Sequence, residues 1–162
     1  MVEVMLVTVL MAVFFGAVYE SVIVGLRAAN AADEREDIRQ QLTNALELLA
    51  REAAVASNVD TAEDQRFQMD GDIDGDGDNE NNINYAVASG DLRRTYSGTA
   101  VTLVRDLTSL DFDYVDLNGA AMTAPVTGGS RDDIRVVQIT MTATRDNETI
   151  SLASAAYLRN NR

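Results

Sequence analysis

The first 26 residues of the chain are dominated by apolar side chains. An apolar run extends over 4–19, interrupted only by Thr8 and Gly16, and apolar character resumes over 22–26 after a single carboxylate, Glu20. The first run falls short of the roughly 20 residues that cross a bilayer comfortably, whereas the two runs together reach that length. Residues 1–26 are therefore predicted to form an apolar half-helix that lies in a membrane.

Beyond Arg27 the pattern changes without any helix-breaking residue. Apolar positions recur at spacings of three and four, with charged residues between them, and this stripe consists of Ile38, Leu42, Ala45, Leu49, Ala53 and Ala56. The spacing predicts an amphipathic half-helix over 27–56 with one covered face. A helix that continues from Val4 to Ala56 is about 80 Å long at 1.5 Å per residue, longer than a domain of this size can enclose. We therefore expect the apolar half to project.

The remaining residues, 57–162, form the predicted head, in which apolar and polar positions alternate. The strand faces are Ile83, Tyr85 and Val87; Leu110, Phe112 and Tyr114; Val137, Ile139, Met141 and Ala143; and, in a last strand, Ile150 and Leu152. Turn residues separate these segments at 89–91, 118–119 and 145–148, and 123–133 is predicted to be a longer surface loop. This pattern predicts one antiparallel sheet whose apolar face packs on the helix stripe, an α+β fold.

The most acidic part of the chain is 70–80, where six carboxylates occur within eleven residues, and it is expected to be neither helix nor strand. Aspartates at alternate positions followed by glycine are typical of calcium loops, because several oxygen ligands must converge from a short turn. The candidate ligands are Asp72, Asp74, Asp76, Asp78 and Glu80, and a second register begins at Asp70. A full EF-hand is excluded, because its twelfth-position glutamate is missing. The competing interpretation is a solvated acidic loop; since mutual repulsion disfavours it, we expect a structural calcium ion.

The composition removes several classes of function. The 162 residues carry a formal net charge of −13 and contain no lysine, no histidine and no cysteine. The chain therefore has no Ser-His-Asp or Cys-His nucleophile, no disulfide and none of the common zinc sites. A carboxylate-based hydrolase needs a defined pair of acids, and the spacing singles out no such pair. We expect a protein that is not an enzyme and, because it has no basic cluster, no nucleic-acid partner.

Glu3 is the informative residue of the apolar half-helix. A charged carboxylate near the head of an apolar helix is costly in lipid, so it indicates a functional group that has a partner. The plainer interpretation places it at the membrane surface, where the helix dipole accepts a negative charge. A cleaved signal peptide is disfavoured, because Glu3 stands where such peptides carry Lys or Arg. A simple single-span anchor explains neither Glu3 nor the amphipathic extension.

Residues 1–10, Met-Val-Glu-Val-Met-Leu-Val-Thr-Val-Leu, resemble the mature start of type IV pilins and type II secretion pseudopilins. Residues 107–119 and 156–160 are similar to the minor pseudopilin J and to related minor pilins. The resemblance implies the pilin fold, and it implies that Glu3 registers an incoming subunit against the methylated N-terminal amine of a neighbour. A carboxylate and an ammonium buried together satisfy each other. The helix proline and the C-terminal disulfide frequent in that family are absent here.

The resemblance implies a structural subunit of a type IV pilus-like or type II secretion pseudopilus-like filament, built from identical or related pilin subunits. Such a subunit lies in the bacterial inner membrane before assembly and in an extracellular or periplasmic filament afterwards. The alternative is a membrane-tethered, calcium-dependent binding module, an adhesin or a sensor, that does not polymerise. Changing Glu3 to alanine discriminates between the two, because only the filament needs the pairing of Glu3.

Overall fold

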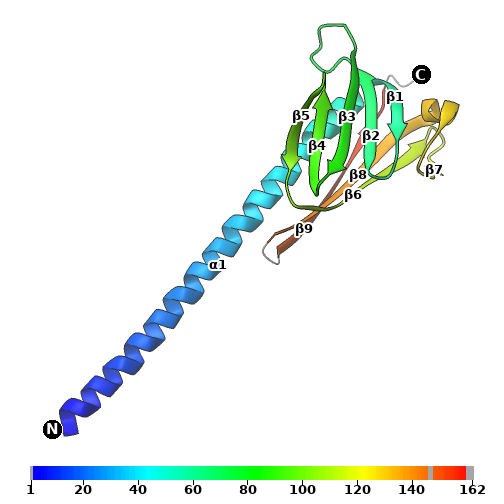
Figure 1. The fold of residues 1–162 in the computed structure, drawn as a ribbon. Helices are drawn as coiled ribbons and strands as arrows, with labels where there is room; N and C mark the ends of the chain where they lie inside the picture. Colours follow the sequence, from blue (N-terminus) through cyan, green and yellow to red (C-terminus); the bar gives the residue numbers. More distant parts are fainter. Residues whose placement is uncertain (1, 146–147, 160–162) are drawn as a thin grey trace.

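The computed structural model describes residues 2–145 and 148–159 and consists of one long helix followed by antiparallel strands (Figure 1). The elements in chain order are α1 (Val2–Ala54), β1 (Ala56–Ala62), β2 (Arg66–Gly71), β3 (Glu80–Ala88), β4 (Asp91–Tyr96), β5 (Thr99–Val104), β6 (Leu107–Asp116), β7 (Ala121–Met122), the 3-10 helix η1 (Gly128–Asp133), β8 (Ile134–Arg145) and β9 (Glu148–Tyr157). The predicted α+β class and the antiparallel pairing are confirmed.

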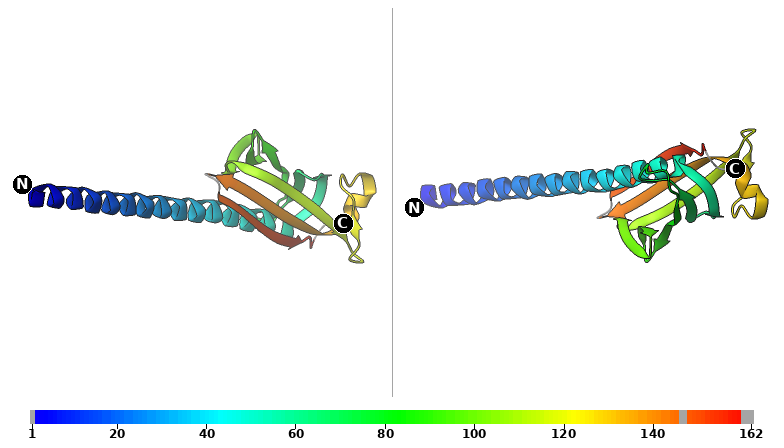
Figure 2. Two further views of the ribbon diagram at one scale, coloured as in Figure 1. Left: turned by 90° about the horizontal axis from the view of Figure 1, so that it is seen from below. Right: turned by 90° about the horizontal axis from the view of Figure 1, so that it is seen from above.

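The helix α1 is a continuous rod whose first half stands clear of the head, as the views in Figure 2 show from two sides. Its first buried side chain is Ile38, so residues 2–37 extend roughly 54 Å beyond the core at 1.5 Å per residue. The predicted projection of the apolar half is therefore confirmed. The helix ends at Ala54, two residues before the predicted end, because Ala56 pairs with Gly71 as the first residue of β1.

The buried face of α1 follows the predicted stripe. Its buried residues are Ile38, Leu42, Ala45, Leu46, Leu49, Glu52 and Ala53. Two of these, Leu46 and Glu52, lie on the covered face but were not part of the predicted stripe. The helix packs mainly against β9 and β8, with smaller contacts to β5 and β2.

The expectation of a single sheet is wrong, because the strands divide into two antiparallel sheets. One sheet has the order β1-β2-β3-β4-β5 and the other has the order β7-β6-β8-β9. The chain passes between them at Asp106, which has a φ of 54°. The two sheets contact each other through Phe67, whose ring centroid lies 5.7 Å from that of Phe112 and 6.4 Å from that of Tyr114. Two narrower sheets bury their apolar faces against each other as well as against α1.

The predicted strand faces are confirmed in β3, β6 and β8, where all of their side chains except Val87 are buried. Val87 is half-buried, as are Ile150 and Leu152 in β9. Turns occur at Ser89–Gly90 and at Asn118–Gly119, as predicted. The loop 123–133 contains η1 and a bridge from Val126 to Ala62. Residues 146–147 of the predicted connection, and positions 1 and 160 of the segments similar to pilins, lie outside the described residues.

Candidate functional site

Most of the exposed large apolar side chains among the described residues lie on the apolar half-helix. By length and composition α1 is able to cross a membrane, and none of its most apolar stretch is buried against the head. Large side chains such as Leu10 and Phe14 are more than half exposed, at 60% and 63%. Glu3 lies in the first turn and forms no ion pair with a described residue. The pairing of Glu3 with a neighbouring subunit therefore stays a prediction.

A cluster of ion pairs fixes the direction in which α1 leaves the head. Arg145, at the end of β8, lies 2.9 Å from Asp37, 3.5 Å from Glu34 and 3.4 Å from Asp106. Burial alone lowers the pKa of Arg145, but its hydrogen bond to Asp37 and the nearby carboxylates outweigh burial and raise it. A further pair joins Arg35 to Glu148 of β9 at 3.1 Å. The β8–β9 hairpin therefore braces the helix where it leaves the head.

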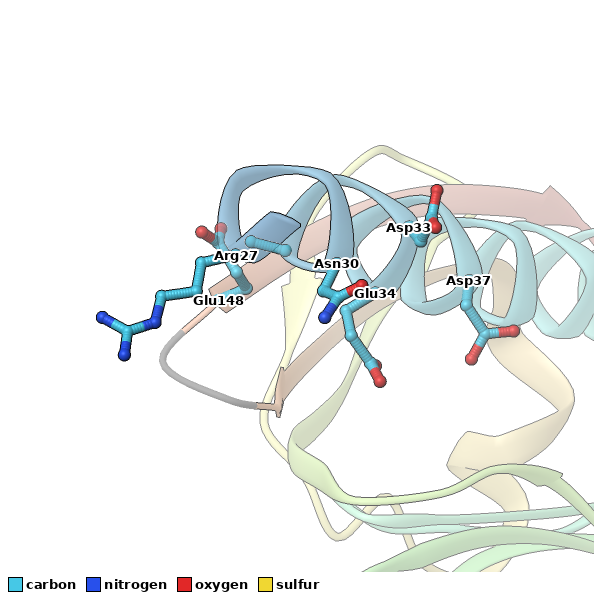
Figure 3. Close-up of a pocket in the computed structure, with 7 residues that line it drawn as sticks. Arg27, Asn30, Asp33, Glu34, Asp37 and Glu148 are labelled. Carbon is cyan, nitrogen blue, oxygen red and sulfur yellow. The ribbon is translucent and has the colours of Figure 1, made fainter. Parts of the chain in front are cut away.

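Beside this brace lies an acidic hollow of about 650 Å³, shown in Figure 3. Its lining is Arg27, Asn30, Ala31, Asp33, Glu34, Asp37 and Glu148. Arg27 extends away from the hollow, whereas Glu34 and Asp37 point to the same side of the helix (Figure 3). Three of its four carboxylates are already paired, Glu34 and Asp37 with Arg145 and Glu148 with Arg35, so the surface is only weakly negative at neutral pH.

The acidic loop brings three of the five predicted metal ligands together. One carboxylate oxygen from each of Asp72, Asp74 and Glu80 lies within 4.8 Å of the others, and we call these residues the acidic triad. The backbone N–H groups of Gly75 and Gly77 donate to the Asp72 carboxylate at 2.6 and 3.1 Å. Both glycines have a positive φ, which explains the glycine spacing of the loop. An exclusively carboxylate donor set suits a hard cation such as calcium.

The other two predicted ligands lie outside the triad. The Asp76 carboxylate accepts a hydrogen bond from the Asp78 N–H at 2.9 Å, so this side chain closes a turn of the loop. The predicted bounds of the irregular segment are also wrong at both ends. Asp70 lies in β2, where its carboxylate accepts from the Asn82 N–H at 2.7 Å, and Glu80 begins β3 by pairing with Gly71. Pairing with the neighbouring strands keeps Asp70 and Glu80 in an extended conformation despite their charge.

A buried polar network that the sequence did not predict joins α1 to the first sheet. The Tyr85 hydroxyl donates to the Glu52 carboxylate at 2.5 Å, and Arg94 Nε donates to the same oxygen at 2.9 Å. Burial raises the pKa of Tyr85, and the neighbouring Glu52 raises it further. The available signal was Glu52 itself, because this charged residue follows Leu49 by three positions on the covered face of the helix.

No protein-family model matches the chain, and no curated protein is significantly similar to it. The fold and the sites themselves define the class of protein. It is an α+β chain in which one exposed apolar helix, long enough to anchor it in a membrane, carries a head with two antiparallel sheets.

Proposed function

We propose that the chain is a non-enzymatic structural subunit of a type IV pilus-like or type II secretion pseudopilus-like filament, assembled through its N-terminal helix. The observation that carries the proposal is the apolar half-helix, whose side chains are mostly exposed and which is continuous with a helix whose other half is built into the core. Each large apolar side chain gains about 1.5–3 kcal/mol on complete burial. Among the described residues of a single chain, none covers this surface.

Two carboxylates favour a half-helix that lies in the membrane first and is then buried against neighbouring subunits. Glu3 and Glu20 both occur within or beside the apolar segment and are exposed. An unpaired charge is penalised in lipid, whereas a helical bundle of copies supplies amines and guanidinium groups to pair with it. The bacterial inner membrane before assembly and an extracellular or periplasmic filament afterwards fit this arrangement.

The proposal is tested by assembly of the purified full chain. We expect helix-cored fibres in electron micrographs after detergent removal from the unaltered chain. Glu3→Ala should abolish the fibres, whereas Glu47→Ala, which removes another exposed carboxylate of α1, should leave them unchanged. A monodisperse soluble monomer with α1 intact contradicts the filament proposal.

The second candidate function is a membrane-tethered, calcium-dependent binding module that does not polymerise. The observation in its favour is the acidic triad, which lies on the β2–β3 loop at the end of the head away from the N-terminus (Figure 1). Such a module presents the loop to the surroundings of the cell and uses α1 only as an anchor. Under this function Glu3→Ala leaves both localisation and calcium response unchanged.

In either function we propose that the acidic triad holds a structural calcium ion. The test uses a truncated chain, residues 27–162, because no side chain before Ile38 is part of the core. Asp72→Asn with Asp74→Asn should abolish calcium binding in titration calorimetry. Asp76→Asn with Asp78→Asn removes the same charge from the same loop and is the matched control, expected to retain binding.

Thermal unfolding gives a second measure of the ion. Calcium at a hundredfold excess over its dissociation constant stabilises the folded state by about 2.7 kcal/mol, which corresponds to roughly 9 °C for 136 residues. Chelator should lower the melting temperature of the unaltered chain, and of the control with Asp76→Asn and Asp78→Asn, by this amount. It should not change the melting temperature of the variant with Asp72→Asn and Asp74→Asn. Equal melting temperatures with and without chelator contradict the calcium assignment.

A further inference from the structure

A second hollow lies on the neighbouring face of α1, between the helix and β9. It has a volume of about 700 Å³ and we call it the alanine groove. Its lining from α1 is Ala28, Ala31, Ala32, Arg35, Glu36 and Arg39, and its lining from β9 is Glu148, Thr149, Ile150, Ser151 and Leu152. The floor is therefore made of small alanines and of the half-buried Ile150 and Leu152. Small side chains at this surface permit another helix to approach closely.

The charges of the alanine groove differ from those of the acidic hollow. Arg35 and Glu148 already neutralise each other at 3.1 Å. Arg39 is exposed and forms no ion pair within the part of the chain that the structure describes. The groove thus offers one available guanidinium, Arg39, above an apolar floor, with the exposed carboxylate of Glu36 one helical turn before it. A complement to Arg39 is an apolar helix that carries a single carboxylate at this end of the groove.

The apolar half-helix of a second copy has this chemistry. Glu20 is its only carboxylate between Val4 and Leu26. The helical face that carries Glu20 also carries the small residues Ala12, Gly16 and Ala17, which lie eight, four and three positions before it. The carboxylate and the closest-packing surface of this helix therefore occupy one face.

We propose that the alanine groove receives the apolar half-helix of a neighbouring copy, with Glu20 of that copy paired to Arg39. This inference rests on the proposed filament function and names its subunit contact. Copies anchored in one membrane point the same way, so the two helices run parallel. Pairing residue 20 with residue 39 fixes an offset of 19 residues, which is roughly 28 Å along the axis.

This single offset brings complementary residues together along the whole groove. In the neighbour, Val9, Ala12 and Val13 face Ala28, Ala31 and Ala32, and Gly16 and Ala17 face Arg35 and Glu36, respectively. Apolar residues meet the alanine floor, and the small side chains of Gly16 and Ala17 lie opposite the long side chains of Arg35 and Glu36. The contact joins two different surfaces of the chain, so it repeats along an axis and does not close into a dimer.

Charge reversal in the full chain tests the contact. We expect Glu20→Arg and Arg39→Glu each to reduce the sedimentable fibre fraction after detergent removal at least tenfold, and the double variant to recover it to within twofold. Arg27→Glu, on the face of the acidic hollow, is the control and should stay within twofold of the unaltered chain. Fibres from Arg39→Glu alone, or no recovery in the double variant, overturn the groove contact while leaving the filament function standing. An unaltered chain that forms no fibres overturns the filament function itself.

Cross-linking gives a second, structural measure, because the chain has no cysteine of its own. Val13→Cys with Ala32→Cys should form a disulfide ladder of multimers in assembled fibres. These two positions are about 28 Å apart along one straight helix, so the bond cannot form within a subunit. Val13→Cys with Ala29→Cys places the second thiol outside the groove and should stay monomeric under the same oxidation. Equal ladders from both pairs, or a ladder from neither, overturn the register.

Discussion

Replacing Arg94 by methionine should destabilise the head strongly, although Arg94 lies on a strand well away from the apolar half-helix. The change keeps an unbranched apolar side chain and removes the guanidinium that faces Glu52. In the folded protein the side chains of Glu52 and Arg94 are only 7% and 17% exposed. The Glu52 carboxylate then retains a single hydrogen bond, from Tyr85, in a buried position.

The magnitude follows from the burial of this pair. Removing one partner of a buried ion pair costs about 3–5 kcal/mol, and we expect the lower end because Tyr85 remains as a donor. A truncated chain of 136 residues has an unfolding entropy of about 0.29 kcal/mol per kelvin at the midpoint, so a loss of about 3 kcal/mol lowers the melting temperature by roughly 10 °C. Arg94 also covers the Tyr96 ring at 5.5 Å, which adds to the loss.

Thermal unfolding of residues 27–162, followed by circular dichroism, measures the effect. The matched control is Arg35→Met, because Arg35 is 62% exposed and pairs with Glu148 at 3.1 Å, close to the 2.9 Å of the buried pair; this change should alter stability by less than about 1 kcal/mol. Adding Glu52→Gln to the Arg94→Met variant removes the unpaired charge and should recover part of the loss. A fall of less than 3 °C for Arg94→Met, or no recovery with Glu52→Gln, refutes the argument that this network is buried and coupled.

Three further changes test other parts of the head. Gly71→Ala should lower the free energy of unfolding by about 1–3 kcal/mol in chemical denaturation, because the added Cβ meets the carbonyl oxygen of Val55 at 2.8 Å. Burial and then the charge of Asp70 raise the pKa of Asp60. The ionised Asp60 side chain therefore destabilises the folded state once the pH rises above the ordinary pKa of an aspartate. Asp60→Asn should therefore raise the melting temperature at pH 7 and leave it unchanged at pH 3. Arg145→Met should leave melting within a few degrees but increase proteolysis of α1 near its exit from the head, as limited digestion would show; unchanged digestion contradicts the bracing role.

The parts of the fold with regular side-chain periodicity were predictable from the sequence. Ile38 and Leu42 repeat at helical spacing, and Phe112 and Tyr114 alternate on one strand, so the covered faces of α1 and β6 follow from spacing alone. The strand β1 was not predictable in this way. Its pairing with β2 is shifted between Ala56 and Asn58 and again after Val59, so every third residue is buried and the alternation disappears.

The acidic triad and the Glu52 network differ in the same way, because the triad is built from residues close together in the sequence and the network from residues far apart. The acidic triad comes from one short segment, and the composition of that segment was sufficient to indicate that carboxylate oxygens gather there. Glu52, by contrast, takes its partners from β3 and β4, 33 and 42 residues further along the chain. No local pattern encodes such distances, and the two-sheet arrangement that brings Arg94 to Glu52 was itself not foreseen.

The uninterrupted helix has a mechanical consequence. A pull on the outer end of α1 travels along one ladder of backbone hydrogen bonds directly into the core stripe, without passing through a loop. Because the stripe from Ile38 to Ala53 runs along the axis of the pull, its packing contacts are loaded in shear and resist together. Separation of such a joint requires all of these contacts to slip at once, whereas a hairpin pulled from its open end yields one pair at a time. The head is therefore attached so that tension along the rod is shared by the whole of its core.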